Sequence, residues 1–195
     1  MKTELLLLAA GKSRRFAGIK QLADINGQAM VCHCLSAYQQ DGKWLEGMTN
    51  GTVVIGANAS VVSEVLPSTV HRYIAQSWEQ GMGHSLAESI GVLSRSTTHV
   101  LVGLADQIAI SSQAIKALLE ASKRHPQKII AAEYQDKAGV PAIFPKAFFS
   151  QLSMLKGDKG ARDILQNNNG NVIKVTMSEA AIDIDTQDDL LRLAR

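Results

Sequence analysis

Short apolar runs alternate with amphipathic stretches along nearly the whole chain. The apolar, β-branched runs predict strands over Glu4–Ala9, Thr52–Ile55, Arg72–Ala75, His99–Leu104, Lys128–Glu133, Ala142–Phe144, Val172–Thr176 and Ala181–Ile184. Helical spacing predicts helices over Ala29–Gln40, Ser60–Leu66, His84–Ser94, Ser112–Arg124, Lys146–Leu152, Ala161–Asn167 and Gln187–Leu193. Strands that alternate with helices of this length predict an α/β fold with a mostly parallel central sheet covered on both faces.

The composition favours one domain over the full 1–195 range. The chain has 195 residues and is 46% hydrophobic, enough for a full core, and it shows no repeat, linker or low-complexity tract. No apolar run approaches the roughly 20 residues that cross a bilayer, and there is no signal-peptide pattern, so we expect a cytoplasmic protein without membrane contact. Cys32 and Cys34 lie two apart on a predicted helix and cannot chelate one ion there, which favours buried, reduced thiols.

Positive charge is concentrated directly after the first predicted strand. The net charge is only +2, too small for a general nucleic-acid binder, yet Lys12, Arg14, Arg15 and Lys20 lie close together. Small residues lead into them, and their backbone N–H groups can approach phosphate oxygens. A Walker A loop is excluded, because its first glycine would fall at Leu6 inside the strand. The pattern favours a triphosphate-binding loop, with a solvated basic turn as the alternative.

Carboxylates follow two of the predicted strands. In an open α/β sheet, ligands bind outside the carboxyl ends of the strands, and Asp106 comes just after His99–Leu104. An acid in this position can hold Mg²⁺ against phosphate oxygens. Asp183 and Asp185 alternate along the last predicted strand, so we expect only one of them to face the site.

A further segment, residues 76–86, has the composition of a ligand loop. Gly81 and Gly83 let the chain pass close to a ligand, and Ser85 or nearby N–H groups can read a base edge or a phosphate. The third glycine of a dinucleotide fingerprint is missing. A loop ending in a helix cap remains the alternative.

Taken together, these segments resemble the molybdenum cofactor cytidylyltransferase family within the MobA-like nucleotidyltransferases. The matches run in order: residues 8–16 with Lys20-Gln21-Leu22; then Trp78, Gly81, Met82, Ser85 and Leu86; Leu104, Asp106 and Gln107; Gly139, Pro141 and Phe144; Gly157, Asp158, Gly160, Ala161 and Arg162; and Asp183, Ile184, Asp185, Thr186, Asp189 and Leu190. Ile108 and Gln187 depart from the pattern, since both stand where the family has proline. Proline would stiffen the loop that carries Asp106.

The resemblance implies a three-layer, Rossmann-like nucleotidyltransferase fold of the GT-A-like kind and a site in three parts. Nucleotide binding would fall to Ala9, Ala10, Gly11, Lys12, Ser13, Arg14, Arg15, Lys20, Gly81 and Ser85. Acceptor binding would fall to Gly139, Pro141, Asp158 and Arg162. Asp106 and Asp185 would bind Mg²⁺, and Arg15, Lys20 and Asp106 would be the catalytic residues.

The implied reaction is transfer of CMP from CTP, or from another NTP, to a molybdopterin-type phosphomonoester. Ala10 favours cytidylyl transfer, because the guanylyl branch usually has glycine there. A guanylyl- or sugar-phosphate nucleotidyltransferase is an alternative within the same class. Another is a non-catalytic nucleotide- or cofactor-binding partner of a molybdoenzyme or its maturation factor.

Overall fold

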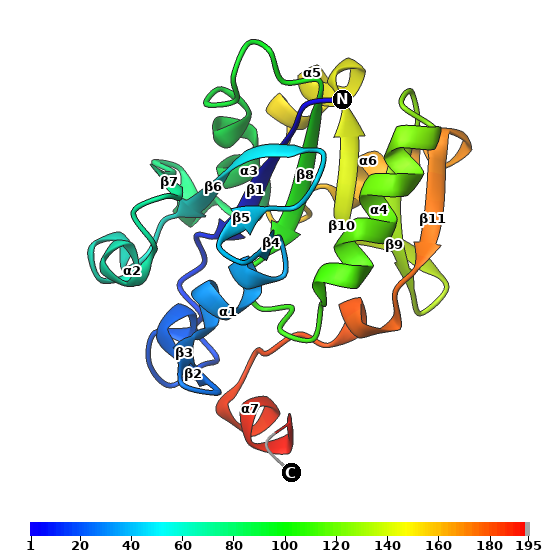
Figure 1. Ribbon diagram of the computed structural model, residues 1–195. Coiled ribbons are helices and arrows are strands. Elements are labelled where there is room, and N and C mark those ends of the chain that lie inside the picture. Colours follow the sequence, from blue (N-terminus) through cyan, green and yellow to red (C-terminus); the bar gives the residue numbers. More distant parts are fainter. Residues whose placement is uncertain (194–195) are drawn as a thin grey trace.

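A seven-stranded sheet forms the centre of the protein (Figure 1), here described from a computed structural model over residues 1–193. Its order is β11-β9-β10-β8-β1-β6-β7. The strands are β1 (Thr3–Ala9), β6 (Met48–Ile55), β7 (His71–Ile74), β8 (His99–Leu104), β9 (Ile129–Tyr134), β10 (Lys137–Pro145) and β11 (Val172–Thr176). Only β10 runs against the others, so the expectation of a mostly parallel sheet is confirmed.

Helices cover both faces of the sheet and complete three layers. They are α1 (Met30–Ser36), α2 (Ala59–Val65), α3 (Met82–Ile90), α4 (Ser112–Arg124), α5 (Phe149–Ser153) and α6 (Arg162–Asn167). A further helix, α7 (Gln187–Leu193), lies away from the sheet (Figure 1). The central strand β1 is buried throughout and alternates between the layers. Leu5 and Leu7 pack with residues of α1, α2 and α4, whereas Leu6 and Leu8 pack with residues of α3, α5 and α6. In Figure 1, α4 crosses in front of the sheet.

Two short hairpins flank α1. One precedes the helix, and the other replaces the end of the longer helix that the sequence predicts. The helix expected over 29–40 ends at Ser36, and β4 (Gln39–Gln40) pairs with β5 (Lys43–Trp44). Between them Asp41 and Gly42 have φ values of 51° and 72°. An Asp-Gly pair with positive φ at both positions is a strong signal for a two-residue hairpin, and it outweighs the helical spacing. Asn26-Gly27 turns β2 (Asp24–Ile25) into β3 (Gln28–Ala29) in the same way.

The predicted strand over 181–184 is wrong. Residues 178–181 form a 3-10 turn, η5 (Ser178–Ala181), and an irregular segment follows. Ile184 donates its N–H to the Asp106 carbonyl over 3.1 Å and buries its side chain against Phe16 and Met30. Tertiary contacts thus hold this segment without a strand partner. The helix expected over 146–152 also differs, because a 3-10 turn, η3 (Lys146–Phe148), precedes α5.

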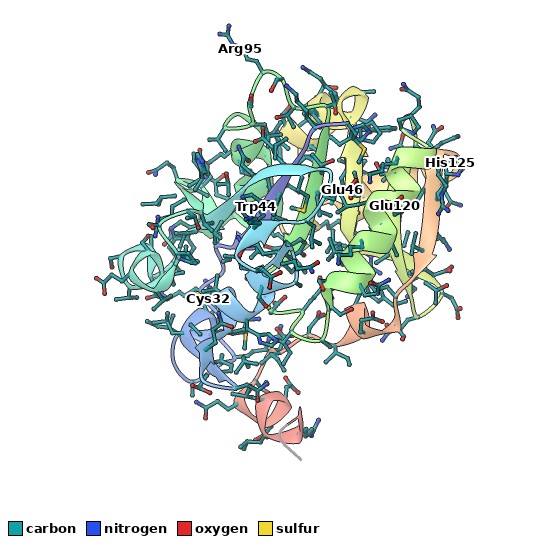
Figure 2. All side chains as sticks on the ribbon, in the orientation of Figure 1. Cys32, Trp44, Glu46, Arg95, Glu120 and His125 are labelled. Atoms are coloured by element: carbon teal, nitrogen blue, oxygen red, sulfur yellow. The ribbon has the colours of Figure 1, made fainter. Side chains whose placement is uncertain are left out.

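The two cysteines are buried, unpaired thiols, as expected. Cys32 lies on α1 (Figure 2), and its Sγ donates to the Val65 carbonyl over 3.1 Å. Burial raises the pKa of both the Cys32 and Cys34 thiols. Neither thiol is therefore set up as a nucleophile or metal ligand. Over residues 1–193, no helix combines the length and apolar character that crossing a membrane requires.

Candidate active site

The loop after β1 is held in place by a buried glutamine. Gln21, on the short 3-10 turn η1 (Lys20–Leu22), donates through Nε2 to the carbonyls of Ala9 (2.9 Å) and Gly11 (2.8 Å). The Ala10 carbonyl accepts from the Ala57 N–H over 3.0 Å. These bonds fix the backbone from which the side chains of Lys12, Arg14 and Arg15 extend to solvent.

Gly11 has no structural requirement for glycine within the protein itself. Its φ is not positive, and a Cβ atom built there would meet no protein atom within 4 Å. The space in front of its backbone is open, at the mouth of a cavity. A glycine in such a place allows an outside group to approach the backbone closely.

Lys20 and Arg15 bring the two predicted metal-binding carboxylates together. Lys20 Nζ lies 2.8 Å from Asp106 Oδ2 and 3.4 Å from Asp185 Oδ1. Arg15 Nη2 lies 2.9 Å from Asp185 Oδ2. The Lys20 side chain is only 12% exposed, so its pairing with two carboxylates is little screened, whereas the Arg15 side chain is 74% exposed and its pair is weaker. Residues far apart in sequence therefore form one charged cluster.

One carboxylate oxygen of Asp106 has no hydrogen-bond partner. Its Oδ2 pairs with Lys20, but its Oδ1 is buried and has no hydrogen-bond partner. A buried carboxylate oxygen without a partner is costly unless a ligand satisfies it. Among residues 1–193 no group of three or more His, Cys, Asp or Glu side chains forms a ready-made metal cage. Two carboxylates are nevertheless enough for Mg²⁺, which keeps several waters or phosphate oxygens.

Asp183 and Asp185 both face the site, so the expectation that only one would do so is wrong. Residues two apart on a strand share one face, so the expectation misapplied the alternation, and this segment is in any case irregular. Asp185 lines one cavity with Asp106, and Asp183 lines a second cavity beside it. Burial of the Asp183 carboxyl in the cleft raises its pKa to about 6, and the charges of Asp106 and Asp185 add to the effect.

The first cavity has a volume of about 700 Å³ and collects most of the residues predicted to bind nucleotide. Its walls include residues 9–14 of the opening loop, Lys20, Asp106 and Asp185 on one side, and Trp78, Gly81 and Ser85 on the other. Arg15 does not line it, but reaches its edge through Asp185. The structure thus gathers at one opening the cations, the carboxylates and the start of α3, which the sequence singled out separately.

The second cavity, of about 350 Å³, adjoins the first and holds three of the four predicted acceptor residues. Gly139, Asp158 and Arg162 line it, together with Tyr134, Lys137, Lys159 and Asp183. Pro141 does not line it; it follows a cis peptide bond where the β9–β10 pairing shifts register. Asp158 and Met82 line both cavities and so mark the boundary between them.

Gly139 is required by close packing. A Cβ atom at this position would lie 2.2 Å from the Tyr134 hydroxyl oxygen on the paired strand β9. Only glycine lets the Tyr134 ring lie flat over β10 at the wall of the second cavity.

The loop carrying Asp106 is fixed by Gln107, which the sequence analysis named only as part of the family pattern, and by His33, which it did not select. Gln107 is buried and donates through Nε2 to the carbonyls of Ala180 (2.7 Å) and Val140 (3.1 Å). His33 Nε2, on α1, lies 2.9 Å from the Ile108 carbonyl and acts there as donor. Ile108, which replaces proline, packs on the small cluster of Phe16, Ile25, Met30, Cys34 and Ile184. Hydrogen bonding and packing therefore hold this loop without proline.

Hydrogen bonds between Thr186 and Asp189 cap the start of α7 next to the site. Thr186 Oγ1 accepts from the Asp189 N–H over 3.2 Å and donates to Asp189 Oδ2 over 2.8 Å, and Asp189 Oδ2 also accepts from the N–H groups of Asp185 (3.1 Å) and Thr186 (2.8 Å). The bond from the Thr186 hydroxyl, followed by the two backbone bonds, lowers the pKa of the Asp189 carboxyl. The start of α7 is thereby fixed immediately after Asp185.

Comparison with known proteins shows a family match and several relatives of similar sequence. The MobA-like NTP transferase domain family matches residues 5–172. The purine catabolism protein PucB of Bacillus subtilis is 25% identical over 204 residues, which cover 97% of this chain and 95% of PucB. The bifunctional protein GlmU of Pseudomonas fluorescens is 26% identical over 176 residues, which cover 87% of this chain but only 37% of GlmU.

Solved structures share the fold along the whole chain. Rv0371c of Mycobacterium tuberculosis superposes with a TM-score of 0.84 at 22% identity, covering 99% of this chain and 98% of Rv0371c. The same protein has also been solved in complex with manganese. A CMP:2-keto-3-deoxy-manno-octonic acid synthetase complexed with CTP superposes with a TM-score of 0.77 at 13% identity, covering 99% and 97% of the two chains.

Proposed function

This chain belongs to the MobA-like NTP transferase domain family, and from that premise we propose that it transfers CMP from CTP to a molybdopterin-type phosphomonoester, releasing pyrophosphate. One observation carries the proposal: Lys20 joins Asp106 and Asp185 at the floor of a cavity of nucleotide size, beside a second cavity. Such an arrangement suits reactions in which two substrates meet over a charged centre.

The opening loop would bind the triphosphate. Lys12 and Arg14 extend into the first cavity beside the open backbone of Gly11, where N–H groups and cations can share the phosphate oxygens. In the structure, Lys20 pairs with two carboxylates. Binding of a triphosphate together with a divalent cation would draw the Lys20 ammonium toward the phosphate oxygens. Lys20 and Arg15 would then neutralise the charge that develops on the departing pyrophosphate.

Asp106 and Asp185 fit a divalent cation. Both offer carboxylate oxygens, Asp106 Oδ1 is buried without a partner, and Mg²⁺ prefers oxygen ligands. A bound Mg²⁺ would neutralise triphosphate charge and help to orient the α-phosphate. Lys20 and Arg15, which occupy the remaining carboxylate oxygens in its absence, keep the repulsion between the two acids low.

The acceptor would enter through the second cavity. One of its phosphate oxygens attacks the α-phosphorus, the bond to the bridging oxygen of the β-phosphate breaks, and pyrophosphate leaves with the electron pair. The attacking oxygen is already anionic near neutral pH, so no strong general base is required. Lys137, Lys159 and Arg162 line this cavity and provide the positive charge that an anionic acceptor needs.

CTP is the favoured nucleotide for two reasons. Ala10 stands where the guanylyl branch usually has glycine, and a protein of the same fold has been solved with CTP. The second candidate reaction is nucleotidyl transfer to a sugar-type acceptor. It is favoured by the likeness to a CMP-sugar-acid synthetase and by the cationic lining of the second cavity.

Measured turnover tests the proposal. The purified protein is incubated with Mg²⁺, each of the four nucleoside triphosphates, and either reduced molybdopterin or a panel of sugar phosphates and sugar acids, and pyrophosphate is assayed. Release only with CTP and molybdopterin is expected. Release only with a sugar acceptor would replace the proposed acceptor by the second candidate. CTP binding without pyrophosphate release from any acceptor would contradict catalysis and favour a binding partner in cofactor maturation.

A further inference from the structure

A short glycine-containing segment, residues 156–158, reaches both cavities through Asp158. Met82 at the start of α3 also lines both cavities. The position of this segment therefore places Asp158 where the two cavities adjoin.

Consecutive residues of α3 hold this segment through its backbone. Gly83 donates its N–H to the Gly157 carbonyl over 2.7 Å, and Gly157 donates its N–H to His84 Nδ1 over 3.0 Å. Both polar backbone groups of Gly157 are thus bonded to the first turn of one helix. His84 Nδ1 also lies 3.1 Å from the Gln80 carbonyl oxygen, to which it could donate only as Nδ1–H. The Gly157 N–H can only donate, so Nδ1 is assigned as its acceptor and the ring proton to Nε2.

The packing leaves no space for side chains between the segment and the helix. A Cβ atom at Gly83 would lie 2.8 Å from the carbonyl oxygens of Lys156 and Gly157. One at Gly81 would lie 2.5 Å from the Gly157 carbonyl oxygen and 2.4 Å from Asp158 Oδ1. Backbone packs on backbone here, and His84 supplies the side-chain bond that fixes the segment.

We infer that His84 is a positioning residue for the acceptor, because its bond to Gly157 holds Asp158 at the boundary between the two cavities. The inference rests on the proposed two-cavity transfer reaction but not on the identity of the acceptor. His84 lines neither cavity, so its effect on the reaction would pass through the backbone of residues 157 and 158. The Lys159 and Arg162 cations follow directly after this segment, so its displacement would move them as well.

Three substitutions separate this role from general stability. His84→Asn places an acceptor oxygen near the position of Nδ1, His84→Gln places its polar atoms nearer Nε2, and His84→Ala removes the contact. His71→Asn, at an exposed position on β7, is the matched control. Two measurements are made: hydrogen exchange of the Gly157 amide, and KM for acceptor and nucleotide with whichever acceptor supports pyrophosphate release.

In His84→Ala and His84→Gln, the Gly157 amide should exchange faster and the acceptor KM should rise about tenfold, as the loss of one hydrogen bond allows. The nucleotide KM and kcat should stay within about twofold, and His84→Asn and His71→Asn should resemble the wild type. Equal Gly157 exchange in wild type and His84→Ala would overturn the inference, as would an equal rise in both KM values. If the wild type turns over no molybdopterin but its Gly157 amide exchanges slowly, the proposed acceptor is contradicted and the role of His84 is not.

Discussion

Two buried glutamines hold the loops of the site, and they differ in how far along the chain they reach. On the nucleotide side, Gln21 donates to the carbonyls of Ala9 and Gly11, which precede it closely in sequence. On the acceptor side, Gln107 donates to the carbonyls of Val140 and Ala180, which come from two distant segments. The same side-chain chemistry therefore closes a local loop in one cavity and joins three parts of the fold in the other.

The comparison predicts that the two sides respond differently to damage. Each glutamine makes one buried bond, to Ala9 or to Ala180, and one partly buried bond, to Gly11 or to Val140. Loss of either amide therefore leaves a buried carbonyl without a donor and should lower stability. The two sides should differ in which substrate is affected, the nucleotide for Gln21 and the acceptor for Gln107.

The largest effect is expected from Asp106→Asn. The amide keeps the shape of the carboxylate but loses the charge that pairs with Lys20 and would hold a cation. Loss of one such contact in the transition state is worth roughly 4 kcal/mol, or about a thousandfold in the rate of pyrophosphate release. Asp188→Asn, at an exposed position of α7, is the control and should retain the wild-type rate. Turnover of Asp106→Asn near the wild-type rate would remove this carboxylate from the chemistry.

Lys20→Met should change two affinities in opposite directions. Without the ammonium, Asp106 and Asp185 lose their shared counterion, so Mn²⁺ should bind the nucleotide-free protein about tenfold more tightly. CTP should bind more weakly, because the triphosphate loses a cation. Electron paramagnetic resonance of free Mn²⁺ measures the first affinity, and calorimetry measures the second. Lys43→Met, on the exposed β5 hairpin, should change neither; weaker Mn²⁺ binding in Lys20→Met would show that Lys20 does not compete with the metal.

Gln107→Leu should lower the free energy of unfolding by about 2 kcal/mol, since two carbonyls lose their donor and one of them is buried. Urea unfolding monitored by circular dichroism measures this difference. The acceptor KM should rise in the same variant, because Val140 lies in the wall of the second cavity. Unchanged stability would mean that the three segments are held together without this amide.

Gln21→Leu is the matched substitution on the nucleotide side and should lower the free energy of unfolding by about 2 kcal/mol as well, because the buried Ala9 carbonyl loses its donor. Its expected effect on catalysis is a higher KM for CTP with an unchanged KM for the acceptor. A rise in the acceptor KM as large as the rise in the CTP KM would break the contrast between the two sides.

The same contrast explains how much could be predicted from the sequence. The opening loop was found because its strand, its small residues and its cations are neighbours in the chain, and Asp106 was found because it ends an apolar strand. The α/β fold class, the mostly parallel sheet and the likeness to MobA-like nucleotidyltransferases are confirmed. The roles given to individual residues stay predictions.

What could not be predicted depends on distant partners. His33 was not singled out in the sequence, and its bond to the Ile108 carbonyl joins residues that no periodicity connects. Residues 181–184 have the composition of a strand, but no neighbouring strand pairs with them. The buried Ile184 fixes this segment, and the acids on either side of it, Asp183 and Asp185, line the two cavities. The Asp41-Gly42 hairpin is different, because its turn signal was readable in the sequence.

The order of the strands also determines when the site can exist during synthesis. β1 pairs with β6 and β8, so that Thr3 meets Met48 and His99, and these long loops must close before the sheet forms. The opening loop is made before Asp106, and Asp106 is made well before Asp185. A nascent chain on the ribosome therefore carries its cationic loop before it has both carboxylates, and the ability to bind a metal–nucleotide complex arises only once residue 185 has been added.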